Sequence, residues 1–332
     1  MATPVPNCAL MEDFATSIPL KASLSMNLLI TIIALPVLVY SMEFIRKTQV
    51  FHRNTRLQIW MHLFGLLLHC VGRLLLHSID LGNYFTRGEN ACDIIPNFYR
   101  CLVLRGFYNV GLALSSMCSV SLVLERFVAY HLSYKYEYCG RFFGIVLMFF
   151  QNILALCYLT SMYFHAAFVP GNFTLYYCQT IASSTGSVWF VIGPLYSVMI
   201  AQIVSRLMFK VLMWKSQNLR VSDEIDLSCR FNLEQSIRSL EALKLLVNCN
   251  TIVFAILSVV TTTLHFNAAS LSKPNYMALV EAVHILPLYG IAICYGVHSK
   301  LRVITENKKE LISKGMKANG DNYFNQFRQQ IK

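Results

Sequence analysis

Three histidines and one arginine recur along a single apolar stretch of the chain: His62, His69, Arg73 and His77. If this stretch is a helix, with about 100° between successive residues, the four side chains lie within an arc of roughly 80°. Imidazole and guanidinium groups in such a stripe can donate hydrogen bonds to a ligand or bind an anion. The histidine spacings do not place two metal ligands on one helical turn, so we expect no metal. A structural hydrogen bond is the simpler role for each histidine.

Further ionisable residues belong to other apolar stretches. Arg105 follows Cys101 by one helical turn, and Glu281 precedes His284 in the last stretch. Because an unpaired arginine is costly in apolar surroundings, each arginine should meet a carboxylate, water or an anionic ligand group. We expect a polar ligand pocket built from Arg73, His77, Arg105, Glu281 and His284, with His265 at its rim. A structural salt bridge among the same residues is the alternative interpretation.

Enzymatic chemistry finds no support in the sequence. Neither an HExxH nor a GxSxG motif is present, and His62, His69 and His77 of the stripe are the only candidates for a catalytic set. We therefore predict a protein that is not an enzyme and needs no cofactor. Retinal binding is also disfavoured, because the last apolar stretch contains no lysine for a Schiff base; Lys273 and Lys300 flank it.

Composition indicates which elements carry these residues. Hydrophobic residues make up 55% of the 332 residues and charged residues 14%, whereas a soluble domain carries about 25% charged residues. Much of the chain must therefore face lipid. The formal net charge of +11 is spread over short segments between apolar runs. This placement favours membrane lipid over nucleic acid as the partner of the basic residues.

Seven apolar stretches are long enough to cross a bilayer as helices, which takes about 20 residues. They span residues 22–45, 57–79, 100–124, 142–165, 185–213, 242–266 and 276–298. We predict an all-α integral membrane protein, a seven-transmembrane helix bundle over residues 22–298. Residues 1–21 precede the bundle and a tail, 299–332, follows it. Neither half of the chain repeats the other, which argues against a transporter built from inverted repeats.

The loops indicate the orientation of the bundle. Most lysines and arginines outside the spans fall on one side, and only Lys21, Arg87, Arg100 and Lys273 fall on the other. Because basic loops face the cytoplasm, we predict an extracellular N-terminus, with the first span as a retained signal anchor, and a cytoplasmic C-terminus. The glycosylation sequon at Asn172 lies on the predicted outer side.

Four cysteines fall on the same side, which is the oxidising one. Cys101 opens the third span and Cys178 lies in the next outer loop. A disulfide between them would fix this loop over the bundle, and free thiols are the alternative. Cys8 and Cys92 remain as a possible second pair. Spacing alone proves neither connectivity.

Glu125 and Arg126 stand at the predicted inner end of the third span. Arg126 is either an ordinary interfacial anchor or a switch, held by Glu125 at rest and released toward a cytoplasmic partner on activation. Its separation from Cys101 resembles rhodopsin-like G-protein-coupled receptors, in which a cysteine opens helix 3 and a D/E-R-Y motif closes it. Here the triplet is Glu125-Arg126-Phe127.

Five segments together resemble the nematode serpentine chemoreceptors of class alpha/beta and the related classes alpha and beta. They cover residues 51–55, 76–81, 101–105, 123–129 and 227–234 and have the sequences FHRNT, LHSIDL, CLVLR, VLERFVA and LSCRFNLE. The resemblance runs over essentially the whole chain and rests on the order and spacing of these segments. Two motifs of the broader rhodopsin-like pattern are missing. The seventh span has Leu286-Pro287-Leu288-Tyr289 in place of N-P-x-x-Y, and the sixth lacks C-W-x-P.

The resemblance implies a multi-pass, G-protein-coupled chemosensory receptor in the plasma membrane of sensory neurons, in their cilia. Its expected partners are a small chemical ligand and a heterotrimeric G protein. In such a receptor we expect Glu125 and Arg126 to take part in coupling, together with Arg230 and Phe231 before the sixth span. The amphipathic extension that holds the latter two is otherwise a solvated helix end. A polytopic transporter or channel using the His/Arg-lined interior is the alternative function.

Overall fold

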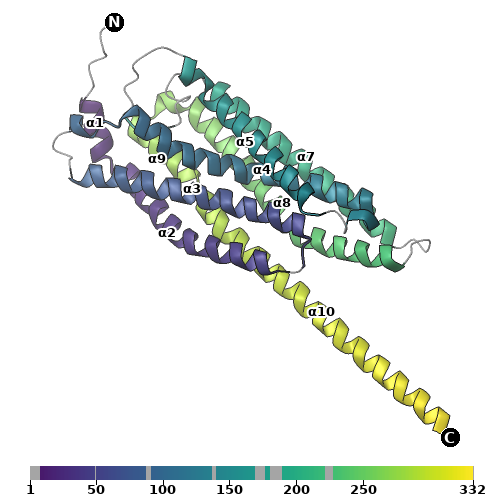
Figure 1. The fold of residues 1–332 in the computed structure, drawn as a ribbon. Helices are drawn as coiled ribbons and strands as arrows, with labels where there is room; N and C mark the ends of the chain where they lie inside the picture. The colour runs from purple at the N-terminus through teal and green to yellow at the C-terminus, as the bar shows by residue number, and fades with distance from the viewer. Residues whose placement is uncertain are drawn as a thin grey trace.

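The structure is a computed structural model that describes residues 8–48, 50–86, 91–136, 140–168, 176–179, 189–220 and 227–331. Within these ranges every regular element is a helix (Figure 1). In chain order they are α1 (Cys8–Thr16), α2 (Ile18–Lys47), α3 (Arg53–Thr86), η1 (Ala91–Ile94), α4 (Phe98–Tyr136), α5 (Phe142–Phe168), α7 (Trp189–Arg220), α8 (Leu227–Phe266), η2 (Ala268–Ser270), α9 (Lys273–Val283) and α10 (Leu286–Ile331).

Seven segments of the described chain are long and apolar enough to cross a membrane: α2, α3, α4, α5, α7, α8 and the pair α9–α10. The predicted all-α bundle of seven spans is therefore confirmed. The helices run longer than the predicted spans; α3, for example, covers Arg53–Thr86 where the sequence predicts 57–79. Which end faces the cytoplasm stays a prediction, so the two ends are named here as the α1 end and the opposite end.

The burial of the helices follows their position in the bundle. α4 is the most buried of the seven spans and packs against α3, α5, α7 and α8, whereas α2 and α5 are among the least buried. Large apolar side chains such as Leu29 on α2 and Phe149 on α5 are exposed on the outer surface. A helix satisfies its own backbone polar groups, so these faces can be covered by lipid.

Small residues allow α3 and α4 to approach closely. A Cβ atom at Gly72 of α3 would lie 2.7 Å from the backbone nitrogen of Tyr108 on α4. A Cβ at Gly111 of α4 would likewise collide with the backbone of His69 on α3. Close packing of backbones through small residues is a main source of helix association in membranes. The contact fixes the rotation of the histidine stripe relative to α4.

The last span is broken between α9 and α10. Pro287 has no N–H to donate and cannot continue a regular helix from α9. The N–H of Ile285 instead donates to the carbonyl of Val283 at 2.8 Å. The carbonyls of Glu281 and His284 are thereby left for side chains of other helices. Broken helices in membranes are tolerated where neighbouring groups satisfy the freed backbone atoms.

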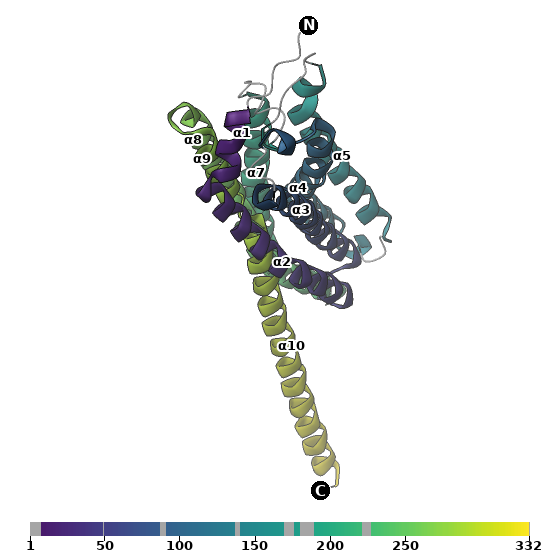
Figure 2. The same ribbon diagram turned by 90° about the vertical axis from the view of Figure 1, so that its left-hand side faces the viewer.

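The two ends of the molecule differ in shape. At one end α1 packs with η1 and the start of α2 over a small hydrophobic core that includes Met11, Phe14 and Leu81. At the opposite end α10 continues well beyond the bundle as a single projecting helix (Figures 1 and 2). Most of the remaining buried apolar residues form one core that runs through the middle of the bundle.

Candidate functional site

Two groups of charged side chains are buried inside the bundle, one near each end. The first consists of Arg73, His77, Arg105, Tyr177 and Glu281 and is called the Glu281 cluster. The second consists of Thr55, Glu125, Arg126 and Tyr136 and is called the Glu125 cluster. A buried charge without a partner is strongly destabilising, so the contacts within each group decide what its members can do.

Glu281 on α9 is the centre of the first cluster. Its carboxylate forms an ion pair with Arg105 of α4. Its Oε2 also lies 3.3 Å from Nη2 of Arg73 and 3.6 Å from Nε2 of His77, both on α3. The hydroxyl of Tyr177 donates to Oε1 at 3.0 Å. The predicted salt bridge is thus present, and one carboxylate serves two arginines.

Arg73 also binds the end of α9. Its guanidinium donates to the carbonyl oxygens of His284 and, at 3.2 Å, Glu281, while Nε donates to Nε2 of His77 at 3.0 Å. Asn27 of α2 donates to the same Glu281 carbonyl at 2.8 Å. Carbonyls at a helix C-terminus carry partial negative charge and are stabilised by a cation. Arg73 therefore caps the break between α9 and α10.

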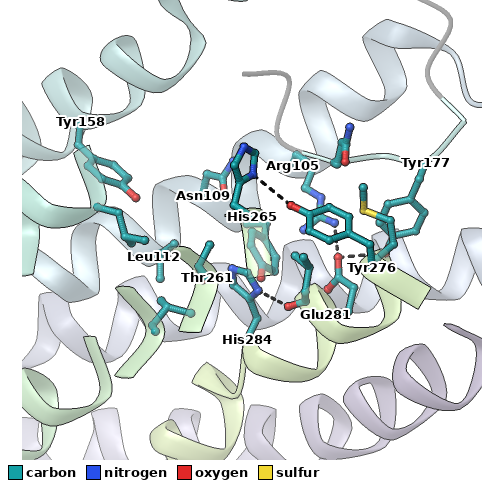
Figure 3. A pocket seen from close by; sticks show the side chains of 16 residues that line it. Arg105, Asn109, Leu112, Tyr158, Tyr177, Thr261, His265, Tyr276, Glu281 and His284 are labelled. Carbon is teal, nitrogen blue, oxygen red and sulfur yellow. Dashed lines mark hydrogen bonds and ion pairs between the residues drawn. The ribbon is translucent and has the colours of Figure 1, made fainter. Parts of the chain in front are cut away.

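A cavity of about 70 Å³ lies beside the Glu281 cluster (Figure 3). Arg105, His265, Glu281 and His284 line it, and Nδ1 of His265 lies 3.3 Å from the hydroxyl of Tyr276. Ligand sites usually measure about 300–1,000 Å³, so a ligand of ordinary size requires the walls to move apart. Of the six residues predicted for this pocket, these four face the cavity.

The other two predicted pocket residues lie behind the cavity wall. Arg73 and His77 are fully buried and do not line the cavity. They hold Glu281 and the end of α9 from the side of α3. Arg73 and His77 therefore support Glu281, which faces the cavity.

Tyr108 and Tyr177 are part of the site although the sequence did not single them out. The guanidinium carbon of Arg105 lies 4.8 Å from the ring centroid of Tyr108 and 5.8 Å from that of Tyr177. Both rings line the cavity. Burial raises the pKa of Tyr177 well above its ordinary value, and nearby Glu281 adds to the shift, so this hydroxyl stays protonated and donates to the carboxylate. Tyr108 could have been found, because it lies one turn from Arg105 on α4.

The structure contains a Cys101–Cys178 bridge and a bridge between the possible second pair, Cys8 and Cys92. The Cα atoms of Cys101 and Cys178 lie 5.0 Å apart, and the carbonyl of Cys178 accepts a hydrogen bond from Nε of Arg105 at 2.5 Å. The bridge therefore positions Tyr177 and a backbone acceptor against the cluster. The second bridge joins Cys8 of α1 to Cys92 of η1, with Cα atoms 4.9 Å apart.

The Glu125 cluster encloses Arg126. Nε of Arg126 donates to Oε2 of Glu125 at 2.5 Å, and Nη2 donates to Oγ1 of Thr55 at 2.6 Å. The hydroxyl of Tyr136 donates to Oε1 of Glu125. Burial raises the pKa of Tyr136, and the Glu125 charge raises it further, so the hydroxyl remains a donor. Both members of the predicted Glu125–Arg126 pair are buried rather than exposed at the end of the bundle.

Three predicted residues lie outside the part of the chain whose side chains the structure describes. Arg230 and Phe231 belong to the first turns of α8, and only their backbone is described. Asn172 lies outside the described residues. Within the described ranges, no group of three or more histidine, cysteine, aspartate or glutamate side chains is arranged to hold a metal ion.

The remaining histidines of the stripe have structural partners. Nδ1 of His62 lies 3.0 Å from the carbonyl oxygen of Ser115, and its Nε2 lies 3.1 Å from the hydroxyl of Tyr289. Nδ1 of His69 lies 3.0 Å from the carbonyl oxygen of Tyr108. These contacts join α3 to α4 and α10 in the middle of the bundle, between the two charged clusters.

The bundle defines the chain as a multi-pass, seven-transmembrane protein. A family model described as "Serpentine type 7TM GPCR receptor class ab chemoreceptor" matches residues 5–332, and the chain belongs to this family. It is also similar to a protein named Serpentine receptor class beta-11 from Caenorhabditis elegans. The two are 21% identical over 292 residues, which cover 86% of this chain and 82% of that protein. The predicted family is thereby confirmed, as is the prediction that the protein is not an enzyme, because the family consists of receptors.

Proposed function

We propose that this chemoreceptor binds a small ligand in the cavity beside the Glu281 cluster and activates a heterotrimeric G protein from the Glu125 cluster. The observation that carries the proposal is the pair of buried ionic clusters near opposite ends of one bundle. Arg105, Tyr177 and Glu281 of the first cluster line a cavity, and the second cluster encloses an arginine that a partner could reach only after a rearrangement. Membership of a family of G-protein-coupled chemoreceptors supports it.

On the ligand side, the roles of the six predicted residues differ. Arg105, Glu281, His284 and His265 present polar groups to the cavity and are proposed to contact the ligand. Arg73 and His77 are proposed to hold Glu281 and the end of α9 in place. Because α10 begins directly after this end, a change at Glu281 can reach the opposite end of the bundle through one helix.

On the coupling side, Glu125 and Thr55 keep Arg126 inside the bundle. Activation is proposed to break these contacts and turn Arg126 toward the G protein, next to Arg230 and Phe231 at the start of α8. This assignment places the opposite end in the cytoplasm and the α1 end outside the cell. The basic loops predict the same orientation.

The test compares G-protein activation by the wild-type receptor and by Arg126→Ala in cells that express both at equal surface levels. We expect the wild type to activate a G protein, alone or with a ligand panel, and the variant to be inactive. Arg46→Ala is the matched control, because Arg46 is exposed near the same end of the bundle and should be replaceable without loss. Equal activity of Arg126→Ala and wild type would contradict the proposal.

The sensory cilium is the proposed location of the receptor. Seven spans make the chain a multi-pass membrane protein, and the chemoreceptor family supports a place where sensory neurons meet external chemicals. A fluorescent fusion expressed in sensory neurons should concentrate in the cilia. Retention in the cell-body membrane alone would argue for another role.

The transporter alternative receives less support from the geometry. His62 and His69 of the proposed pathway are bonded to neighbouring helices, and Arg73 is bonded to the end of α9. A pathway along this stripe would require breaking these contacts. Vectorial uptake of a panel compound by receptor-containing vesicles, without G-protein activation in cells, would favour the transporter.

A further inference from the structure

The Glu281 cluster holds more positive than negative charge. Arg73 and Arg105 are both buried and share the single carboxylate of Glu281. The nearby Asp80 does not balance the surplus, because it pairs with a third arginine, Arg100, at 3.5 Å. Counted over the arginines and carboxylates that the structure describes here, one positive charge remains without a carboxylate partner. Such a charge is costly in a low-dielectric interior, so an anion that reaches it is favoured.

Of the two arginines in the cluster, Arg105 is the one that lines the cavity. Arg73 does not line the cavity and is stabilised by the carbonyls at the end of α9. Arg105 lines the cavity, while Glu281 is engaged by two arginines and by the hydroxyl of Tyr177. A cationic ligand would therefore meet Arg105 and a carboxylate that is already engaged. An anionic ligand would meet Arg105.

The rest of the cavity wall narrows the class of anion. The hydroxyl of Tyr108, next to Arg105, is buried and makes no hydrogen bond of standard geometry with the described residues. Farther along the wall are apolar side chains, among them Leu112, Leu195 and Leu257. A ligand that fits these surroundings has one charged end that accepts hydrogen bonds and one apolar end.

We propose that the receptor binds monoanionic organic acids, with the carboxylate placed between Arg105 and the Tyr108 hydroxyl and the apolar part against the leucines. One surplus positive charge matches one negative charge, so a dianion such as a phosphate monoester exceeds what the site can neutralise. The proposal rests on the cavity being the ligand site, as proposed above. To that proposal it adds the sign of the ligand's charge, and it excludes amines as ligands.

The first experiment measures binding without any G protein. Purified full-length receptor in lipid nanodiscs is unfolded by heat in the presence of three sets of compounds. Each set contains an acid, its amide and an amine with the same carbon skeleton: acetate, acetamide and ethylamine; benzoate, benzamide and benzylamine; octanoate, octanamide and octylamine. We expect at least one carboxylate to raise the Tm, with its amide and amine giving smaller shifts or none. Stabilisation by amines or amides equal to that by acids overturns the proposal, as does a lack of stabilisation by every carboxylate.

The second experiment uses the opposite charges of Arg105 and Glu281. Arg105→Gln should weaken binding of the stabilising acid at least about tenfold, a loss of about 1.4 kcal/mol. Glu281→Gln should strengthen it, because the competing carboxylate is removed. A purely structural role would weaken binding in both variants, and an amine site would show the reverse pattern; either outcome overturns the proposal.

Controls separate ligand class from folding and from coupling. Arg105→Lys keeps the charge and should keep the preference for acids even where Gln destabilises the fold. Arg302→Gln changes an exposed arginine on α10 and should leave acid binding unchanged. Arg126→Ala should bind acids normally although it does not signal. Acid binding without any G-protein activation by wild type would leave this inference standing and contradict the proposed function, whereas activation by amines alone would do the opposite.

Discussion

Glu281 connects two helices through its ion pairs inside the bundle. It is 1% exposed and contacts Arg73 and Arg105, which come from two different helices. The sequence predicts this grouping because ionisable residues inside a bilayer must find partners, and Glu281 is the acidic residue available near the two arginines. Tyr108 could have been inferred from its position one turn from Arg105, but the sequence cannot predict that Tyr177 completes the group. The chain has 17 tyrosines, and their rings fit apolar surroundings almost anywhere in a bundle.

Replacing Glu281 with alanine should destabilise the receptor strongly. Both arginines would remain buried without a carboxylate, which typically costs about 3–5 kcal/mol. The measurement is thermal unfolding of the purified receptor in nanodiscs. Glu43→Ala is the control, because Glu43 forms only exposed pairs with Arg46 and Lys47 and should leave the Tm unchanged. Similar Tm values for both variants would show that the Glu281 pairs are not needed for stability.

Tyr136 offers a second test at the scale of single residues. Its hydroxyl donates to the carboxylate of Glu125, which in turn holds Arg126. Tyr136→Phe removes one hydrogen bond to a charged group, worth about 1.5–3 kcal/mol, and should make the release of Arg126 easier. We expect higher ligand-independent G-protein activation at equal surface expression. Tyr295→Phe, at an exposed position on α10, should not change it, and a decrease for Tyr136→Phe would contradict the release mechanism.

At the scale of elements, the apolar stretches predict the helices, but not how the last one is divided. Hydropathy depends on length and composition, and the seventh stretch is apolar on both sides of the break. Pro287 signals a possible interruption. Whether a membrane helix bends or breaks depends on which groups accept or donate at the gap, and those groups come from α2 and α3. Asn27 and Arg73 are distant in sequence from the carbonyls that they bind.

The contact of α3 with α4 can be tested with two glycines of the same helix. Gly111→Ala places a methyl group against the α3 backbone and should reduce stability by about 1–3 kcal/mol. A Cβ atom at Gly106 would have no neighbouring atom within 4 Å. Because alanine has the better helix propensity, Gly106→Ala should leave stability unchanged or slightly higher. Thermal unfolding of the two variants in parallel is the measurement. Equal loss in both would mean that close approach of α3 and α4 is not what the glycine provides.

At the scale of the whole molecule, the segment before the first span is part of the folded structure. α1 is tied to η1 by the Cys8–Cys92 bridge, and the ring of Phe14 lies parallel to that of Tyr177 with centroids 6.2 Å apart. The sequence predicts residues 1–21 as an extracellular N-terminus and Cys8–Cys92 as a possible pair, but it contains no signal for where this segment packs. Nine residues of helix have too little periodicity to reveal a partner surface.

Loss of the Cys8–Cys92 bridge should loosen α1. A bridge of this kind contributes about 2–4 kcal/mol through the unfolded state, so Cys8→Ser should lower the Tm of the receptor. It should also make the segment before α2 more sensitive to limited proteolysis on intact cells. The double variant Cys8→Ser/Cys92→Ser should behave like either single variant if the two sulfurs form one bond. An additive loss in the double variant would contradict the pairing.

The break in the last span turns α10 into a lever. Its 46 residues, beginning at Leu286, extend about 69 Å at 1.5 Å per residue, and a tilt of about 5° at the break would carry the far end about 6 Å sideways. The pivot lies beside Arg73 and Glu281, where the cavity is. A small displacement at the cavity would thus become measurable by distance-sensitive fluorescence between the far end of α10 and the end of α7. The position of the far end of α10 would therefore report the state of the cavity.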